Sequence, residues 1–269
     1  MKNIIFSYHN EIRLLFFIIS LILVSSFESF FPNKHKLKHK LLRWVNNFVL
    51  FSINTLLIKL IFPFVTITFS FYVSEKNIGI FNYFKINPII CSIISIILLD
   101  ILIYFQHYLF HKNTFLWRFH RSHHADINLD FTTGLRFHPI EIIISMFIKL
   151  IFILILGPPA IAVLVFEIIL NTSSMFNHSN ILLNKKVDSF LKKIIITPNM
   201  HRIHHSDHIP DQNSNFGFSL SCWDYIFKTY KNMNSNELKK INIGIKEINT
   251  KRELWIDKIL IEPFNKIKN

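Results

Sequence analysis

Long apolar stretches dominate this chain and restrict the folds that are open to it. Four of them stand out, at residues 14–31, 48–73, 88–106 and 140–176. A helix needs about 20 apolar residues to cross a bilayer, and inside lipid its backbone must be satisfied by its own hydrogen bonds. The chain is 51% hydrophobic and 17% charged, too apolar for an ordinary soluble domain. We therefore expect an all-α polytopic membrane protein with about four transmembrane helices or hairpin legs.

The fourth stretch is too long for a single span and contains Gly157, Pro158 and Pro159. Two consecutive prolines remove two backbone donors and stop a helix. The pattern predicts a hairpin with legs at 140–156 and 160–176. The first stretch follows a segment with no small-residue cleavage site, so we expect it to remain as a membrane anchor.

Basic residues predict the orientation of the chain. The segment 32–44 has five lysines and arginines and no acidic residue, whereas 74–87 has Lys76 and Lys85 against Glu75. The positive-inside rule places 32–44 in the cytoplasm and 74–87 outside, together with the N-terminus. The third stretch then returns the chain to the cytoplasmic interface.

Three histidine clusters have helical spacing. They are His107-x3-His111, His120-x2-His123-His124 and His201-x2-His204-His205. Residues at i, i+3 and i+4 share one face of a helix, so each cluster can direct several imidazoles at one point. Adjacent histidines diverge by about 100° and suit two different ions. The pattern predicts a histidine-rich dimetal site in a helical cap on the cytoplasmic side.

Three further residues are candidates near this site. His178 follows the predicted hairpin and is expected to be a metal ligand, and His138 precedes the hairpin and is a possible ligand or supporting residue. Asp100 lies two helical turns before His107, within an apolar span where an acid is usually functional or paired. It can accept a hydrogen bond from a ligand imidazole; the alternative is an interhelical pair with Lys59.

Composition excludes several functions. The formal net charge of +13 suits anionic lipid headgroups, although a general bias toward Ile, Lys, Asn and Phe explains it equally well. Basic residues flank apolar segments and form no basic-aromatic face, which argues against nucleic-acid binding. With five glycines there is no phosphate-binding loop. Cys91 and Cys222 are too few for a disulfide framework or a cysteine zinc site.

The motifs resemble the fatty acid hydroxylase / sterol desaturase superfamily of integral membrane oxygenases. The resemblance runs from about Asp100 to Tyr230, roughly half of the chain, through HYLFH, LWRFHRSHHAD, RFHPIE, FNHSN, TPNMHRIHHSD and NFGFSLSCWDYIFKTY. Two positions depart from the usual pattern. Tyr108 stands where many members have Arg, and Lys228 stands where the terminal motif has Gly.

The resemblance implies a diiron centre and an O2-dependent reaction on a lipid C–H bond, with no catalytic residue beyond the metal ligands. It also implies an external electron donor of cytochrome or ferredoxin type with its reductase, because the chain has no nicotinamide or flavin motif. Imidazole suits zinc as well as iron, so zinc stays possible as a substituted metal. The implied ligands are His107, His111, His120, His123, His124, His201, His204 and His205, with His178 in addition.

The same reasoning divides the chain into an N-terminal anchor of two spans at 1–90, a catalytic domain at 91–232 and a tail at 233–269. A desaturase with the same centre is the first alternative to a hydroxylase. A metal transporter or metal-storage protein is a more distant one, since the histidines gather at one interface. A zinc hydrolase would need a Glu base, as in HExxH, and the chain lacks that motif.

Overall fold

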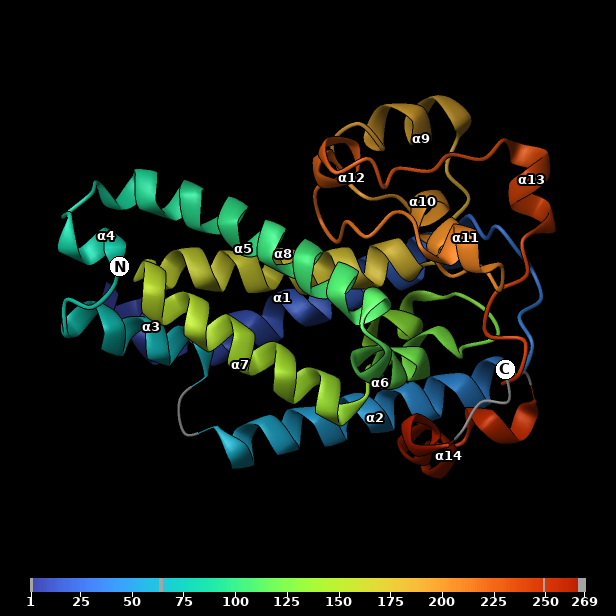
Figure 1. Ribbon diagram of the computed structural model, residues 1–269, viewed down its shortest axis with the longest axis horizontal. Coiled ribbons are helices and arrows are strands. Elements are labelled where there is room, and N and C mark those ends of the chain that lie inside the picture. The colour runs from blue at the N-terminus through green and yellow to red at the C-terminus, as the bar shows by residue number, and fades with distance from the viewer. Residues whose placement is uncertain (1, 63–64, 249, 266–269) are drawn as a thin grey trace.

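A computed structural model describes residues 2–62, 65–248 and 250–265 of the chain (Figure 1). Within these residues all regular structure is helical, and extended pairing is limited to three isolated bridges. The predicted all-α class is confirmed. The long helices lie side by side, and most of the short ones gather at one end of the bundle, whereas α3 (Thr66–Glu75) and α4 (Ile80–Tyr83) lie at the other.

Five regions of the described chain are long and apolar enough to cross a membrane, at Phe6–Phe30, Lys40–Tyr83, Pro88–Lys112, Pro139–Leu156 and Ala160–His178. They are built from α1 (Lys2–Phe30), α2 (Lys40–Ile61), α3 (Thr66–Glu75), α4 (Ile80–Tyr83), α5 (Pro88–Lys112), α7 (Pro139–Leu156) and α8 (Ala160–His178). The count exceeds the expected four because the fourth apolar stretch supplies two of them.

The predicted hairpin is confirmed. Helix α7 ends at Gly157, whose φ of 66° is the left-handed conformation that commonly terminates a helix. Helix α8 starts after Pro159, which is extended. The Gly-Pro-Pro sequence therefore separates the two legs close to the expected boundaries.

The stretch 48–73 lies within one candidate span, Lys40–Tyr83, as expected, but it does not form one continuous helix. Helix α2 ends at Ile61 and α3 begins at Thr66, while residues 63–64 lie outside the described part. Phe62 is extended, with φ −110° and ψ 109°. It precedes Pro63 in the sequence, and a residue before proline is driven out of the helical region.

The two ends of the bundle differ in what they bring together. At one end the loop after α3 meets the hairpin turn, where a Cβ on Gly79 would lie 2.4 Å from the backbone nitrogen of Gly157. At the other end the segment after α1 meets the end of α8, where the Asn33 amide donates to the Asn180 carbonyl at 2.7 Å. The histidine clusters lie at this second end (Figure 1).

Short helices form a cap over this second end. They are α6 (Thr114–His124), η1 (Phe131–Leu135), α9 (Lys185–Leu191), α10 (Pro198–His204), α11 (Ile209–Gln212), α12 (Cys222–Ile226), α13 (Ser235–Lys240), η2 (Lys251–Leu254), α14 (Ile256–Ile261) and η3 (Glu262–Phe264). The tail completes the cap, because Glu262 pairs with Arg121 on α6 and the Ile256 amide donates to Asn46 on α2 at 2.8 Å.

Local sequence explains where the site-bearing helices begin. Helices α5, α7 and α10 each carry proline at their first position, after Asn87, His138 and Thr197. The side chains of these three residues accept a hydrogen bond from the first helical turn. A side-chain cap followed by proline is a strong start signal for a helix.

Close packing sets the position of η1 beneath the site. A Cβ on Gly134 would lie 2.5 Å from the Ser174 carbonyl oxygen, so η1 packs directly on the backbone of α8. Phe131 and Leu135 of η1 share a buried cluster with Val24 of α1. Lipid provides no hydrophobic driving force for the association of helices, so this close packing holds η1, α1 and α8 in place.

Candidate metal centre

Nine histidines form two adjoining groups at the capped end of the bundle. Within each group, one ring nitrogen from every member lies within 4.8 Å of the others. The five-histidine group is His107, His111, His120, His124 and His204, and the four-histidine group is His123, His178, His201 and His205. All nine residues expected to be ligands are therefore brought together.

Helical spacing produces this division. The i, i+4 pairs His107/His111 on α5 and His120/His124 on α6 face the same group. Adjacent histidines separate, with His123 and His124 in different groups, as their divergence of about 100° predicts. The rings of His124 and His205 stack across the boundary with centroids 4.2 Å apart.

Hydrogen bonds fix the orientation of five rings through Nδ1. The acceptors are backbone carbonyls in four cases: Phe216 for His107 (2.8 Å), Arg136 for His123 (2.9 Å), Ser174 for His178 (2.6 Å) and Ser214 for His204 (2.8 Å). The fifth acceptor is the Glu141 carboxylate, 2.7 Å from His120. Because these oxygens only accept, each Nδ1 carries the hydrogen, and a neutral ring then presents a lone pair at Nε2.

The Nε2 lone pairs converge in both groups. In the five-histidine group none of the five buried Nε2 atoms has a hydrogen-bond partner among the described residues. In the four-histidine group the Nε2 of His178 lies 2.9 Å from the Nε2 atoms of both His123 and His201. In His123 and His178 these atoms are both unprotonated, so their contact is repulsive unless a cation lies between them. The donor set fits two metal ions.

Burial keeps the cap histidines neutral. Desolvation, reinforced by neighbouring histidines, holds the pKa values of His123, His124, His201 and His205 well below the usual range. Desolvation also lowers the pKa of His204 to about 3. Metal binding requires neutral imidazoles, and these rings are neutral across the physiological range.

His138 lies in neither group, so its possible role as a ligand is not supported. It caps α7 by accepting from the Ile140 amide, and its Nε2 lies 3.2 Å from the Leu260 carbonyl. Its ring packs against Phe119 and Phe264. Pro139, the next residue, begins α7, and the side chain of His138 serves as the N-terminal cap of that helix.

Asp100 is bonded to neither of the partners that were expected. Its carboxylate accepts from the Trp223 indole at 2.8 Å and from the Leu220 amide at 3.2 Å. Seven residues before His107, it lies about 10 Å away along α5, level with the loop before α12. Asp100 therefore anchors that loop and does not support an imidazole.

Two supporting carboxylates were not anticipated. Glu141 on α7 binds His120 and is the only carboxylate bonded to a histidine of either group in the described chain. Asp224 accepts from the backbone amides of Phe216 and Gly217, at 2.8 and 2.9 Å, and so holds the loop whose Phe216 carbonyl binds His107. The available signals were the motifs RFHPIE and CWDY, which contain both acids.

A buried polar network ties α2 to this end of the bundle. Arg43 pairs with Asp126 and with Asp130, and its side chain is fully buried. It also donates to the Asn128 carbonyl and to Thr133. Since the network spans the loop between α6 and η1, it restrains the segment that leads to the Arg136 carbonyl, the acceptor for His123.

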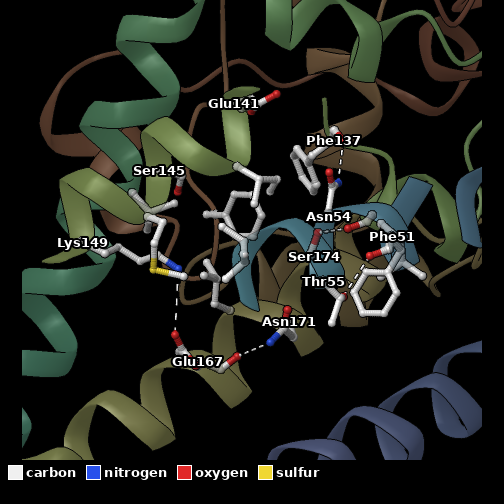
Figure 2. A pocket seen from close by; sticks show the side chains of 18 of the residues that line it. Phe51, Asn54, Thr55, Phe137, Glu141, Ser145, Lys149, Glu167, Asn171 and Ser174 are labelled. Carbon is white, nitrogen blue, oxygen red and sulfur yellow. Dashed lines mark hydrogen bonds and ion pairs between the residues drawn. The ribbon is translucent and has the colours of Figure 1, made fainter. Parts of the chain in front are cut away.

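Two cavities reach the five-histidine group. The first, of about 280 Å³, touches His107 and His120 and runs between α2, α5, α7 and α8 (Figure 2). The second, of about 1100 Å³, is lined by cap residues and reaches His111. One side of the group therefore faces the interior of the helix bundle and the other faces the cap.

Comparison with known proteins gives a consistent result. The model of the fatty acid hydroxylase family matches residues 92–229. A relative, the ornithine lipid hydroxylase OlsE of Rhizobium tropici, is 29% identical over 140 residues, which are 52% of this chain and 41% of the relative. The chain thus matches less than half of that protein's length. No solved structure matches.

Proposed function

The chain belongs to the fatty acid hydroxylase family, and from that premise we propose that it is a membrane-bound diiron oxygenase that hydroxylates a C–H bond of a lipid. The observation that carries the proposal is the convergence of nine imidazoles in two adjoining groups, five of them held by hydrogen bonds at Nδ1 that leave Nε2 unprotonated. The overall reaction consumes the lipid, O2, two electrons and two protons, and yields the alcohol and water.

Each histidine group is proposed to hold one iron. The five-histidine group would use His107, His111, His120, His124 and His204, and the four-histidine group His123, His178, His201 and His205. When bound, the two irons supply the reduction of O2 and the oxidation of an unactivated carbon.

The side chains of the protein orient this centre and keep it dry. The carbonyl acceptors hold the imidazoles with Nε2 inward, and the Glu141 carboxylate fixes the ring of His120 in the same way. Seven of the nine rings are less than 4% exposed, which excludes water from the place where the oxidant forms. The cavity beside His107 and His120 brings the lipid carbon to the five-histidine group.

Electrons are proposed to come from an external cytochrome or ferredoxin with its reductase. The cap-side cavity supports this route, because it reaches His111 from outside the helix bundle. We further propose that this end of the bundle faces the cytoplasm, as the basic segment 32–44 indicates.

Hydroxylation is favoured over desaturation by the family and by the activity named for the relative. The test combines metal analysis of purified protein with lipid profiling of cells with and without the gene, grown under labelled O2. We expect about two irons per chain and a lipid that gains one labelled oxygen atom. A lipid that only loses two hydrogens would establish desaturation, and a metal-free or zinc-only active protein would overturn the proposal.

A further inference from the structure

Three charged side chains meet among the membrane helices and line the 280 Å³ cavity. Figure 2 shows two of them, Lys149 and Glu167, at the opposite end of the cavity from Glu141. The Glu167 carboxylate on α8 lies 3.0 Å from Nε of Arg13 on α1 and 3.9 Å from Nζ of Lys149 on α7. Thr66 on α3 also donates to Glu167. Ionisable groups in a span are costly, and they usually mark a functional site.

The charges in this cluster do not balance. One carboxylate faces two cations, and Arg13 and Thr66 already occupy it. The Lys149 ammonium makes no hydrogen bond to any side chain or carbonyl in the described residues, and its side chain is only 13% exposed. Lys149 lines the cavity, so its ammonium has hydrogens free for an anion that enters there. A link whose only role was to join helices would instead bring the ammonium within hydrogen-bond distance of the carboxylate.

Polar groups line the rest of the cavity. Asn54 on α2 is 6% exposed and donates its amide nitrogen to the Phe137 carbonyl at 2.8 Å. Because a carbonyl can only accept, the orientation of the amide is fixed, and the Oδ1 of Asn54 has no partner. Ser145 and Asn171 lie on the same walls (Figure 2). A purely hydrocarbon ligand would leave the Oδ1 of Asn54 without a hydrogen bond.

We propose that this cavity binds the polar part of an anionic lipid, with its carboxylate or phosphate on Lys149 and Arg13 and an N–H or O–H of the lipid on Asn54. The inference rests on the proposed function and names its substrate class. Lys149 lies about 12 Å along α7 from Glu141, which binds His120. The oxidised carbon is therefore near the headgroup of the lipid, about that distance from the anion, and the acyl tail extends out of the cavity between the helices.

The test measures equilibrium binding, which needs no turnover. Purified protein in nanodiscs is titrated with radiolabelled palmitic acid, its methyl ester, palmitoyl lysophosphatidate and monopalmitoyl glycerol. We expect wild-type protein to bind one or both anionic lipids at least about tenfold more tightly than the neutral ones, as a charge-assisted hydrogen bond predicts. The preferred anion distinguishes a carboxylate from a phosphate headgroup.

Three variants locate the preference. Lys149→Met leaves the Arg13–Glu167 pair in place and should remove the preference while binding of the methyl ester is unchanged. Lys149→Arg keeps the positive charge and should keep the preference for anionic lipids. Lys76→Met, which changes an exposed lysine outside the cavity, should bind as wild type does.

Equal binding of charged and neutral lipids by wild-type protein would refute the proposed anion site, whether or not the variants fold. So would an undiminished preference in Lys149→Met. Oxygen consumption on lipid, measured separately with a reductase and a cytochrome or ferredoxin supplied as the electron source, distinguishes the two proposals. Selective binding without oxidation refutes the oxygenase proposal and leaves the anion site standing. Oxidation without selective binding refutes the anion site and leaves the oxygenase proposal standing.

Discussion

The Nε2 atom of His178 on α8 lies 2.9 Å from that of His123 on α6, although both rings donate through Nδ1 to backbone carbonyls. The pair is separated by 55 residues in the sequence. Two lone pairs this close need a cation between them, which makes His178 a ligand of the four-histidine group under the proposed function.

His178→Ala is therefore expected to lower the bound iron from about two to about one per chain and to abolish lipid oxidation, with the protein still in the membrane. His204→Ala should do the same in the five-histidine group. Iron is measured by mass spectrometry on purified protein. His35→Ala, an exposed histidine outside both groups, is the control, and full iron content in His178→Ala would exclude it as a ligand.

Glu141→Ala should reduce turnover about 10- to 100-fold, because His120 loses the acceptor that fixes the orientation and tautomer of its ring. KM should change little. Glu141→Gln keeps an acceptor oxygen without the charge and should recover part of the loss. Steady-state kinetics on both variants decide this. If Gln and Ala are equally impaired, orientation through the hydrogen bond is not the role of Glu141.

Arg43→Met should destabilise the protein by about 3–5 kcal/mol, because it leaves Asp126 and Asp130 as uncompensated buried charges. Thermal unfolding in detergent measures the effect. The matched control is Arg252→Met, which removes an exposed arginine–aspartate pair with Asp257 and should leave the melting temperature unchanged. Similar melting temperatures for the two variants would show that the Arg43 network is not needed for stability.

Asp224 should make stability depend on pH. Desolvation raises the pKa of its carboxyl from 3.8 to about 6, so folding favours the protonated form. The stabilising contribution of Asp224 is fully present below the pKa of its carboxyl in the unfolded chain. As pH rises between about 4 and 6 this contribution is lost, which lowers the free energy of unfolding by up to about 3 kcal/mol. Comparing the melting temperatures of wild type and Asp224→Asn across this range isolates the effect. Parallel pH profiles would contradict it.

Local sequence signals predicted the elements and the histidine grouping well. Gly157 and the two prolines after it act within one turn, so the hairpin could be located from sequence alone. The division of His123 from His124 follows from helix geometry. The break between α2 and α3 had a similar local signal in Pro63, but continuous hydropathy on both sides masked it.

Contacts between distant segments could not be predicted in this way. The sequence predicts a ligand imidazole or Lys59 as the partner of Asp100. In the structure Asp100 accepts a hydrogen bond from Trp223, 123 residues away. Glu141 supports His120 because α6 packs against α7, which no sequence period encodes. The Arg13–Lys149–Glu167 cluster joins three helices and depends on the whole bundle.

The histidines of both groups extend from residue 107 to residue 205, and α10 contributes to each group. During translation, the last membrane helix has therefore left the ribosome before either group is complete. Under the proposed function, iron is then acquired by a chain whose membrane helices are already inserted, so its delivery is a post-insertion event. Early termination between α8 and α10 would leave all five candidate spans in place but remove His201, His204 and His205 from the two groups.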